Sequence, residues 1–329
     1  MDNRYDIWKE EEYTYRGAYG FVPNLRTYLH DDDKIRDCLV VVPGGGYCMC
    51  VPSEAGIIKD EFFGRGMNVL VLTYTTDITM SVPLGRQPLK DISRAVRFIR
   101  KNAEQFRIDP ERIVICGFSA GGHLCSCLAT HFAEIEDPDP QLASFSNRPS
   151  AAILSYPVIT AGEYTHIWSI VALAGPEPSE ADKDFFSSEK NVTEDTSPCF
   201  IWQTREDDLV PVENSYLMAQ ALKEKGVPFA HYVFPNGRHG LSLPTAEFFR
   251  GGFGEDYTME QVMRAVDAVK EGNGVDVSPE RKKELEIQFS GEGGMPVPEE
   301  DPEELAARFR DIAYWPELAC IWLDGLFNS

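Results

Sequence analysis

The chain has 329 residues, of which 43% are hydrophobic, and it is strongly acidic: 53 Asp and Glu against 31 Lys and Arg give a formal net charge of −22. Such an excess of negative charge repels phosphate backbones and anionic lipid surfaces, so we expect neither a nucleic-acid partner nor a membrane partner. No apolar run reaches the roughly 18 residues of a membrane span, and the first residues lack the pattern of a secretion signal. We therefore expect a cytoplasmic protein.

Apolar runs of strand length alternate with segments of helical spacing along most of the chain. The strand-like runs are residues 38–43, 68–73, 112–117, 151–156, 198–204 and 228–234. The helical segments between them are residues 53–65, 88–99, 120–132 and 212–225. Continuous apolar strands separated by amphipathic helices are typical of a mostly parallel sheet covered on both faces. We predict one doubly wound α/β domain that spans residues 1–329.

Two segments interrupt this alternation. Residues 160–197, after the strand at 151–156 (counted as strand 6), are acidic, aromatic and irregular, and we interpret them as a cap-like helical insertion. Residues 251–313 contain amphipathic segments divided by turns rich in Gly and Pro, which predicts a helical insertion acting as a lid or an interface in a homo-oligomer. The apolar segment 315–326 is expected to return to the sheet as a helix.

The sequence Gly117-Phe118-Ser119-Ala120-Gly121 matches the pattern G-x-S-x-G and falls between a predicted strand and a predicted helix. This is the context of a nucleophile elbow, a sharp turn that holds a serine in a strained backbone conformation above the sheet. The alternative, a glycine-rich loop that only caps the helix, explains the glycines without using the serine. We predict that Ser119 is a nucleophile.

A glycine triplet, Gly44-Gly45-Gly46, follows the strand at 38–43. Its backbone N–H groups can approach a substrate oxygen without interference from side chains, and together with the Ala120 N–H they would stabilise an oxyanion. A phosphate-binding loop is the competing interpretation. It is disfavoured because neither a following Lys-Ser/Thr nor a G-x-G-x-x-G pattern is present.

A serine nucleophile needs an adjacent base, and in this kind of fold the chain order is Ser, acid, His. His166, His231 and His239 follow the serine. His239 lies in a loop after the strand at 228–234, where active-site loops gather, so we predict that it is the base. The acid is expected in the run Glu206-Asp207-Asp208, and the residues alone leave these three open. No His pair shows metal-ligand spacing, so neither a metal nor a cofactor is expected.

Taken together, these motifs resemble the small α/β-hydrolases of the acetyl esterase group, carbohydrate esterases that include the BD-FAE enzymes and act on xylan-type sugars. The segments that carry the resemblance are residues 43–47, 117–124 and 210–215, with His239-Gly240. The resemblance implies an α/β-hydrolase fold with Ser119, Asp207 and His239 as the catalytic triad. It also implies Gly45, Gly46 and Ala120 as oxyanion donors.

Three further residues are expected to contact substrate, namely Tyr47, His123 and Tyr156. For His123, one helical turn after Ser119, a buried side chain with a satisfied hydrogen bond is the alternative. Aromatic residues of the insertions are candidates for stacking on sugar rings or for small local cores; they are Tyr164, Trp168, Phe185, Phe186, Phe248, Phe249 and Phe253.

The predicted function is that of a serine esterase that removes small acyl groups, chiefly acetyl, from oligosaccharides. A peptidase or an arylformamidase on the same fold is the alternative, and it predicts turnover of amides instead of acetyl esters. A non-catalytic binding module is disfavoured, because such a module has no need of a serine, an acid and a histidine in catalytic order.

Overall fold

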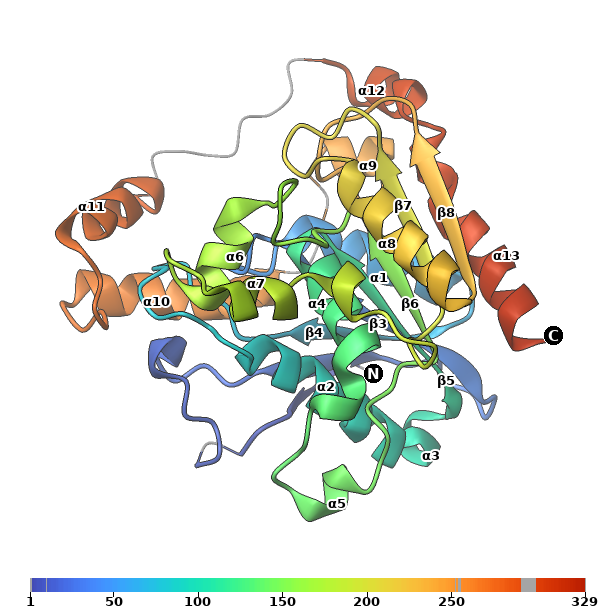
Figure 1. Ribbon diagram of the computed structural model, residues 1–329, viewed down its shortest axis with the longest axis horizontal. Helices are drawn as coiled ribbons and strands as arrows, with labels where there is room; N and C mark the ends of the chain where they lie inside the picture. The colour runs from blue at the N-terminus through green and yellow to red at the C-terminus, as the bar shows by residue number, and fades with distance from the viewer. Residues whose placement is uncertain (1, 10, 252, 254–255, 291–299, 329) are drawn as a thin grey trace.

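The computed structural model describes residues 2–9, 11–251, 253, 256–290 and 300–328, and these residues contain one eight-stranded sheet (Figure 1). The strands lie in the order β1-β2-β4-β3-β5-β6-β7-β8. Strands β1 and β2 pair antiparallel, as do β2 and β4, whereas all the remaining pairs are parallel. The strand bounds are β1 Asp2–Asp6, β2 Asn24–Tyr28, β3 Arg36–Val42, β4 Asn68–Thr73, β5 Ile108–Phe118, β6 Ala151–Ser155, β7 Cys199–Thr204 and β8 Phe229–Phe234.

Helices fill the connections between the strands. The α-helices are α1 Gly56–Gly64, α2 Gln87–Lys101, α3 Ala103–Phe106, α4 Ala120–His131, α5 Pro140–Ala143, α6 Ile167–Ala174, α7 Glu180–Phe185, α8 Glu213–Lys225, α9 Ala246–Phe249, α10 Glu260–Lys270, α11 Pro279–Gln288, α12 Pro302–Arg308 and α13 Trp315–Phe327. The 3-10 helices are η1 Arg16–Ala18, η2 Pro52–Glu54, η3 Phe132–Glu134, η4 Ser188–Asn191, η5 Asp256–Met259 and η6 Ile312–Tyr314.

The sheet separates two hydrophobic cores. Side chains alternate between the faces of a strand, so Cys38, Val40 and Val42 of β3 point into a core shared with α2, α4 and α8. The intervening Leu39 and Val41 point into a second core shared with α1 and α13. Both sets are fully buried, which explains the continuous apolar run in this strand. The predicted parallel, doubly wound sheet with helices on both faces is confirmed.

The parallel strands end at one edge of the sheet, where their loops meet. Val42 at the end of β3 pairs with Gly117 of β5, and Thr204 at the end of β7 pairs with Phe234 of β8. The loops that follow β3, β5, β7 and β8 therefore converge, and in sheets of this kind ligands bind outside the carboxyl ends of the strands.

The two inserted segments are arranged differently around the sheet. Residues 160–197 form α6, α7 and η4, close to α4 and α8. Within 256–313, α10 and α11 lie together on one side of the molecule and α12 lies beside α9 on the other (Figure 1). Part of the segment, 291–299 with 252, 254 and 255, is outside the described residues. A single domain, a cap-like role for 160–197 and a lid or interface role for 251–313 stay predictions.

The C-terminal helix α13 packs back on the sheet, as expected. Its first residue, Trp315, is fully buried, stacks on Trp202 of β7 with ring centroids 5.4 Å apart, and donates from Nε1 to the Ser242 carbonyl oxygen at 2.7 Å. This packing ties the end of the chain to the sheet next to the loop that follows β8.

Candidate active site

Ser119 occupies the turn between β5 and α4. Its backbone has φ 52° and ψ −117°, a conformation that non-glycine residues rarely adopt. The flanking glycines are required because β-carbons there would collide with backbone: one on Gly117 would lie 2.2 Å from the Gly121 oxygen, and one on Gly121 would lie 2.1 Å from the Val42 oxygen. The chain therefore forms a tight, strained elbow that presents the Ser119 side chain at the edge of the sheet.

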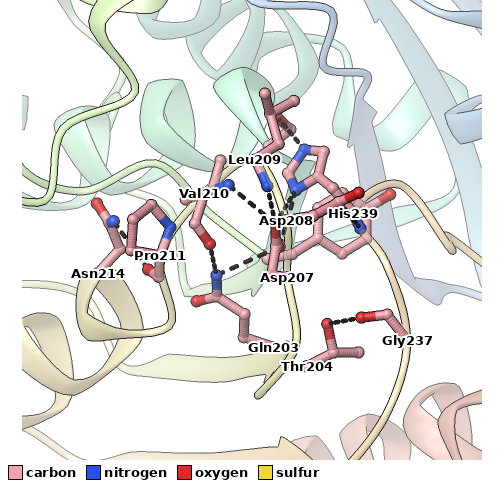
Figure 2. A network of polar contacts seen from close by, with 12 residues as sticks. Gln203, Thr204, Asp207, Asp208, Leu209, Val210, Pro211, Asn214, Gly237 and His239 are labelled. Carbon is pink, nitrogen blue, oxygen red and sulfur yellow. Dashed lines mark hydrogen bonds and ion pairs between the residues drawn. The ribbon is translucent and has the colours of Figure 1, made fainter.

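His239 reaches Ser119 from the loop after β8. Its Nε2 lies 2.8 Å from Ser119 Oγ. Its Nδ1 lies 2.8 Å from one carboxylate oxygen of Asp207 and 3.0 Å from the other (Figure 2). The Asp207 side chain is completely buried, and that of His239 is 11% exposed. Asp207 also accepts hydrogen bonds from the backbone N–H groups of Leu209 and Val210 at 3.0 and 2.8 Å. These bonds fix the carboxylate against the imidazole.

Asp208 has a different place. Its carboxylate accepts the backbone N–H of His239 at 3.0 Å and therefore holds the loop, not the imidazole (Figure 2). Glu206 is exposed and pairs with Arg205 at 2.7 Å. Of the three acidic residues among which the sequence pattern could not choose the acid, Asp207 is the one whose oxygens face the imidazole. The sequence predicted this residue through the family resemblance and not from the run of carboxylates itself.

The glycine loop after β3 lies on the other side of Ser119. Gly45 and Gly46 have φ 121° and 62° and line the same cavity as Ser119. The turn is closed by bonds from the N–H groups of Cys48 and Met49 to the Gly45 oxygen at 2.9 and 3.3 Å. Within the described chain, the N–H groups of Gly45, Gly46 and Ala120 donate to no protein acceptor. All three predicted oxyanion donors thus adjoin Ser119 with their N–H groups unused.

Glu54 is a buried acid beside the site that the sequence analysis missed. One carboxylate oxygen accepts the Gly44 N–H at 2.6 Å, and the other accepts the Tyr156 hydroxyl at 2.7 Å. Burial raises the pKa of this carboxyl, although both hydrogen bonds act in the opposite direction. A β-carbon on Gly44 would lie 2.9 Å from both Glu54 and Ser119 Cβ, so this glycine is wedged between them. A single Glu at the start of a helical segment has no pattern that would reveal this role.

Tyr47, His123 and Tyr156 were expected to contact substrate, and the structure corrects this. Their side chains are at most 2% exposed, and they do not line the cavity beside Ser119. The Tyr47 hydroxyl donates to His123 Nδ1 at 2.7 Å, and His123 Nε2 donates to the Phe186 carbonyl oxygen at 2.8 Å. Burial lowers the pKa of His123 to about 4. The open alternative, a buried His123 with satisfied hydrogen bonds, is the arrangement present.

Tyr156 supports the imidazole. Its ring meets that of His239 edge to face, with centroids 4.9 Å apart, while its hydroxyl is held by Glu54. We call Glu54, Tyr156, Asp207 and His123 the inner wall of the site, since all four side chains are buried and hydrogen-bonded within the protein.

A cavity of about 450 Å³ opens beside Ser119. It is lined by Gly45, Gly46, Cys48, Val51, Ser53, Glu54, Met80, Ser119, His166, Trp168, Leu209, His239 and Gly240. We call Met80, His166, Trp168 and Leu209 its rim. His166 precedes the acidic run at 206–208, against the expected order of serine, acid and histidine, yet it lies in the cavity. A larger hollow of about 610 Å³ behind the His239 loop includes Gly237 and Arg238 but neither Ser119 nor His239.

His231 donates or accepts a bond with Ser215 Oγ at 3.1 Å, away from Ser119. In the described part of the chain, no three His, Cys, Asp or Glu side chains are arranged to hold a metal ion. Among the same residues, no helix has the length and apolar character needed to cross a bilayer.

The sheet order and the serine elbow after β5 together define the class of protein: an α/β-hydrolase. The BD-FAE family matches residues 26–222, more than half of the chain, and the chain belongs to this family. The predicted family is therefore confirmed.

Two relatives extend the comparison. Endo-1,4-beta-xylanase B of Butyrivibrio fibrisolvens is 59% identical over 266 residues, which cover 81% of this chain and 42% of that protein. Acetylxylan esterase of Xylanibacter ruminicola is 30% identical over 215 residues, which cover 63% of this chain and 41% of that protein. The chain thus spans about two fifths of the length of these relatives.

Solved structures support the fold. The acetyl ester-xyloside bifunctional hydrolase from Caldicellulosiruptor lactoaceticus superposes with a TM-score of 0.69 at 34% identity, covering 83% of this chain and 97% of that one. MGS-M1, an alpha/beta hydrolase from a deep-sea metagenome, gives a TM-score of 0.60 at 23% identity and bears on the fold alone. The predicted fold class is confirmed, and the reported matches include two hydrolases of acetyl esters.

Proposed function

We propose that this protein is a serine esterase that forms an acyl-enzyme on Ser119. The observation that carries the proposal is the continuous chain of hydrogen bonds from Ser119 Oγ through His239 to Asp207, with both imidazole contacts at 2.8 Å. Because an imidazole with a carboxylate on Nδ1 presents an unprotonated Nε2 to the hydroxyl, this arrangement is suited to activate the serine.

The reaction follows from this geometry. His239 Nε2 takes the proton of Ser119 as Oγ bonds to the carbonyl carbon of the ester. The N–H groups of Gly45, Gly46 and Ala120 stabilise the resulting oxyanion, and Asp207 stabilises the imidazolium. The intermediate then expels the alcohol, which receives the proton from His239. A water molecule, deprotonated by His239, attacks the acyl-enzyme and releases the acid with Ser119 regenerated.

The proposed substrate is an acetyl ester on a sugar of the xylan type. Support comes from the names of an acetylxylan esterase and an acetyl ester-xyloside hydrolase among the relatives. The cavity agrees with a sugar ester because it has a volume in the range of small-molecule sites and contains both apolar and polar side chains. The substrate class that we propose is acetyl esters of oligosaccharides, and not esters with long acyl chains.

Two other activities are less well supported. Acylamino-acid-releasing enzymes from Oryza sativa and Arabidopsis thaliana match at 25% and 30% identity, so amide turnover is the alternative on the same triad, as for a peptidase or arylformamidase.

Xyloside cleavage commonly needs two carboxyl groups about 5–10 Å apart that face the sugar. Among the described residues that line the cavity, Glu54 is the one acid, and both of its oxygens are already bonded.

The test of the proposal is the Ser119→Ala variant. Acetate release from acetylated xylo-oligosaccharides and hydrolysis of p-nitrophenyl acetate are expected to fall at least about 10⁴-fold, because the nucleophile is lost. Ser144→Ala, an exposed serine remote from the cavity, is the matched control and should retain wild-type rates. A fluorophosphonate should label wild-type Ser119 and fail to label the variant. Residual turnover near the wild-type rate would refute the mechanism.

A further inference from the structure

His166 lines the cavity beside Ser119, and one of its ring nitrogens has no partner among the described residues. Its Nδ1 is bonded to Ser169 Oγ at 2.8 Å, and within the described residues its Nε2 has no partner. The ring stands over the glycine loop, since a β-carbon built on Gly46 would lie 3.9 Å from His166 Cε1. Ser169 is fully buried, which fixes the orientation of the imidazole.

The imidazole of His166 is neutral at neutral pH. Burial lowers its pKa, and the nearby His239 acts in the same direction, while Asp207 opposes both. A neutral imidazole has one N–H and one acceptor nitrogen, and the Ser169 hydroxyl can either donate to Nδ1 or accept from it. Nε2 is therefore a single donor or a single acceptor. A hydroxyl group of a ligand matches either state, since it can both donate and accept.

Trp168 lies beside His166 and is 60% exposed. Its side chain takes part in no ring pair and no hydrogen bond with any other described residue. The two phenylalanines of the same segment are used internally: Phe186 is 4% exposed, and Phe185 stacks on His131 with centroids 4.2 Å apart. These phenylalanines belong to the local core that the sequence left as an alternative. Trp168 does not; together with Leu209, which is 50% exposed, it leaves apolar surface in water where both side chains line the cavity.

The cavity has room for more than an acetyl group. An acetyl group is three heavy atoms in size, whereas the cavity measures about 450 Å³. The remaining space, bounded by Trp168, His166 and the half-exposed Leu209, is available to the alcohol part of an ester. An acyl chain would favour an enclosed apolar pocket, whereas this rim combines an exposed indole face with a free polar nitrogen. A pyranose ring offers both matching features, a C–H face and hydroxyl groups at its edge.

We propose that Trp168 and His166 form the subsite for the alcohol part of the substrate and that they bind a pyranose ring. The indole face packs against the C–H face of the sugar, and Nε2 of His166 bonds to a sugar hydroxyl. This inference rests on the proposed esterase function and adds to it which residues select the sugar.

The experiment compares two acetyl esters that differ only in the alcohol: a mono-acetylated methyl β-xylopyranoside and ethyl acetate, which has no ring. The quantity measured is the ratio of their kcat/KM values, from acetate release. We expect Trp168→Ala to lower this ratio at least tenfold, mainly through KM for the glycoside, and Trp168→Phe to restore most of it. His166→Leu should lower the ratio about three- to tenfold, the range of one hydrogen bond.

Ile167→Ala is the matched control. Ile167 lies between the two residues and is 49% exposed, but it does not line the cavity. The ratio of kcat/KM values in Ile167→Ala should therefore stay within twofold of wild type. A ratio in Trp168→Ala equal to that of wild type would refute the subsite while leaving the esterase function intact. An equal loss on ethyl butyrate would also refute it, since Trp168 would then contact the acyl chain. A wild-type enzyme that cleaves ethyl acetate but not the glycoside would refute the sugar specificity itself.

Discussion

The inner wall and the rim of the site are built in opposite ways. In the inner wall, Glu54, Tyr156 and His123 are at most 4% exposed and bond to other protein groups. In the rim, Trp168 and Leu209 are 60% and 50% exposed. A buried, fully bonded wall holds reacting groups at fixed distances, whereas an exposed apolar rim is free to contact a ligand. We infer that the inner wall determines the rate of the chemical step and the rim determines which alcohol is accepted.

Within the inner wall, the largest effect is expected from Asp207→Asn. An amide group placed against His239 Nδ1 favours the wrong tautomer of the imidazole, so kcat should fall about 10³–10⁴-fold. Asp208→Asn should cost less than about tenfold, because its remaining amide oxygen can still accept the His239 N–H. Kinetics with p-nitrophenyl acetate, alongside circular dichroism spectra of both variants, measure the difference. A larger loss at Asp208 would contradict the assignment of the acid.

The next effect concerns stability and pH. The pKa of His123 is about 4 in the folded protein, below its usual value near 6.5, because the side chain is buried. Between these values the unfolded chain binds a proton that the folded protein does not. The free energy of unfolding should therefore fall by about 3 kcal/mol as the pH drops from 6.5 to 4, a loss assigned to this one group.

Urea unfolding of wild type and of His123→Gln at pH 7 and pH 4.5 measures this loss. The variant has no titrating group at this position, so its stability should depend less steeply on pH than that of wild type. Equal pH dependence in the two proteins would show that His123 does not contribute to acid sensitivity.

Glu54 is expected to have a smaller effect on catalysis. Glu54→Leu leaves the Gly44 N–H and the Tyr156 hydroxyl buried without an acceptor, so kcat should fall about 10- to 100-fold with little change in KM. Glu54→Gln should recover most of the rate, since its oxygen can accept from Gly44 and its amide can donate to the tyrosine oxygen. A change confined to KM, or an equal fall in kcat for Glu54→Leu and Glu54→Gln, would place Glu54 outside the inner wall.

The smallest effect is expected from a residue that supports the rim without lining the cavity. Gln261 of α10 accepts the Thr76 N–H at 2.9 Å, and α10 packs its apolar side chains against Ile78, two residues before the rim residue Met80. Gln261→Ala should raise KM for a sugar ester about two- to threefold and lower the melting temperature by about 2–4 °C, with kcat retained. Gln220→Ala, on the exposed side of α8, is the control. A fall in kcat with unchanged KM would contradict the division between wall and rim.

Much of the sheet could be predicted because its central strands are apolar on both faces. The six runs from 38–43 to 228–234 correspond to β3 to β8. Strands β1 and β2 were missed because they pair antiparallel at the edge and carry charged residues such as Arg4 and Arg26. The start of β5 at Ile108 was also missed, because Asp109, Pro110 and Glu111 interrupt its apolar run.

The residues of the site also divide into those that the sequence predicted and those that it did not. Ser119 and His239 follow from local patterns, a glycine-flanked elbow and a loop after a strand. Glu54 and His166 have no such pattern, because their positions depend on contacts with Gly44 and Gly46, made only when the chain is folded. The substrate contacts expected of Tyr47 and Tyr156 were wrong for a related reason: the direction in which these side chains point, inward and away from the cavity, is set only when the chain is folded.

The backbone conformation of Ser119 has a consequence for how this site can change during evolution. At φ 52° a second branch on Cβ is strained, since β-branched residues are genuine outliers at positive φ. Threonine, the other residue with an aliphatic hydroxyl, is therefore excluded from this position even though it carries the same reactive group. Cysteine has an unbranched Cβ and fits the same backbone. Exchange of serine for a thiol nucleophile is thus sterically open to this scaffold, whereas exchange for threonine is closed.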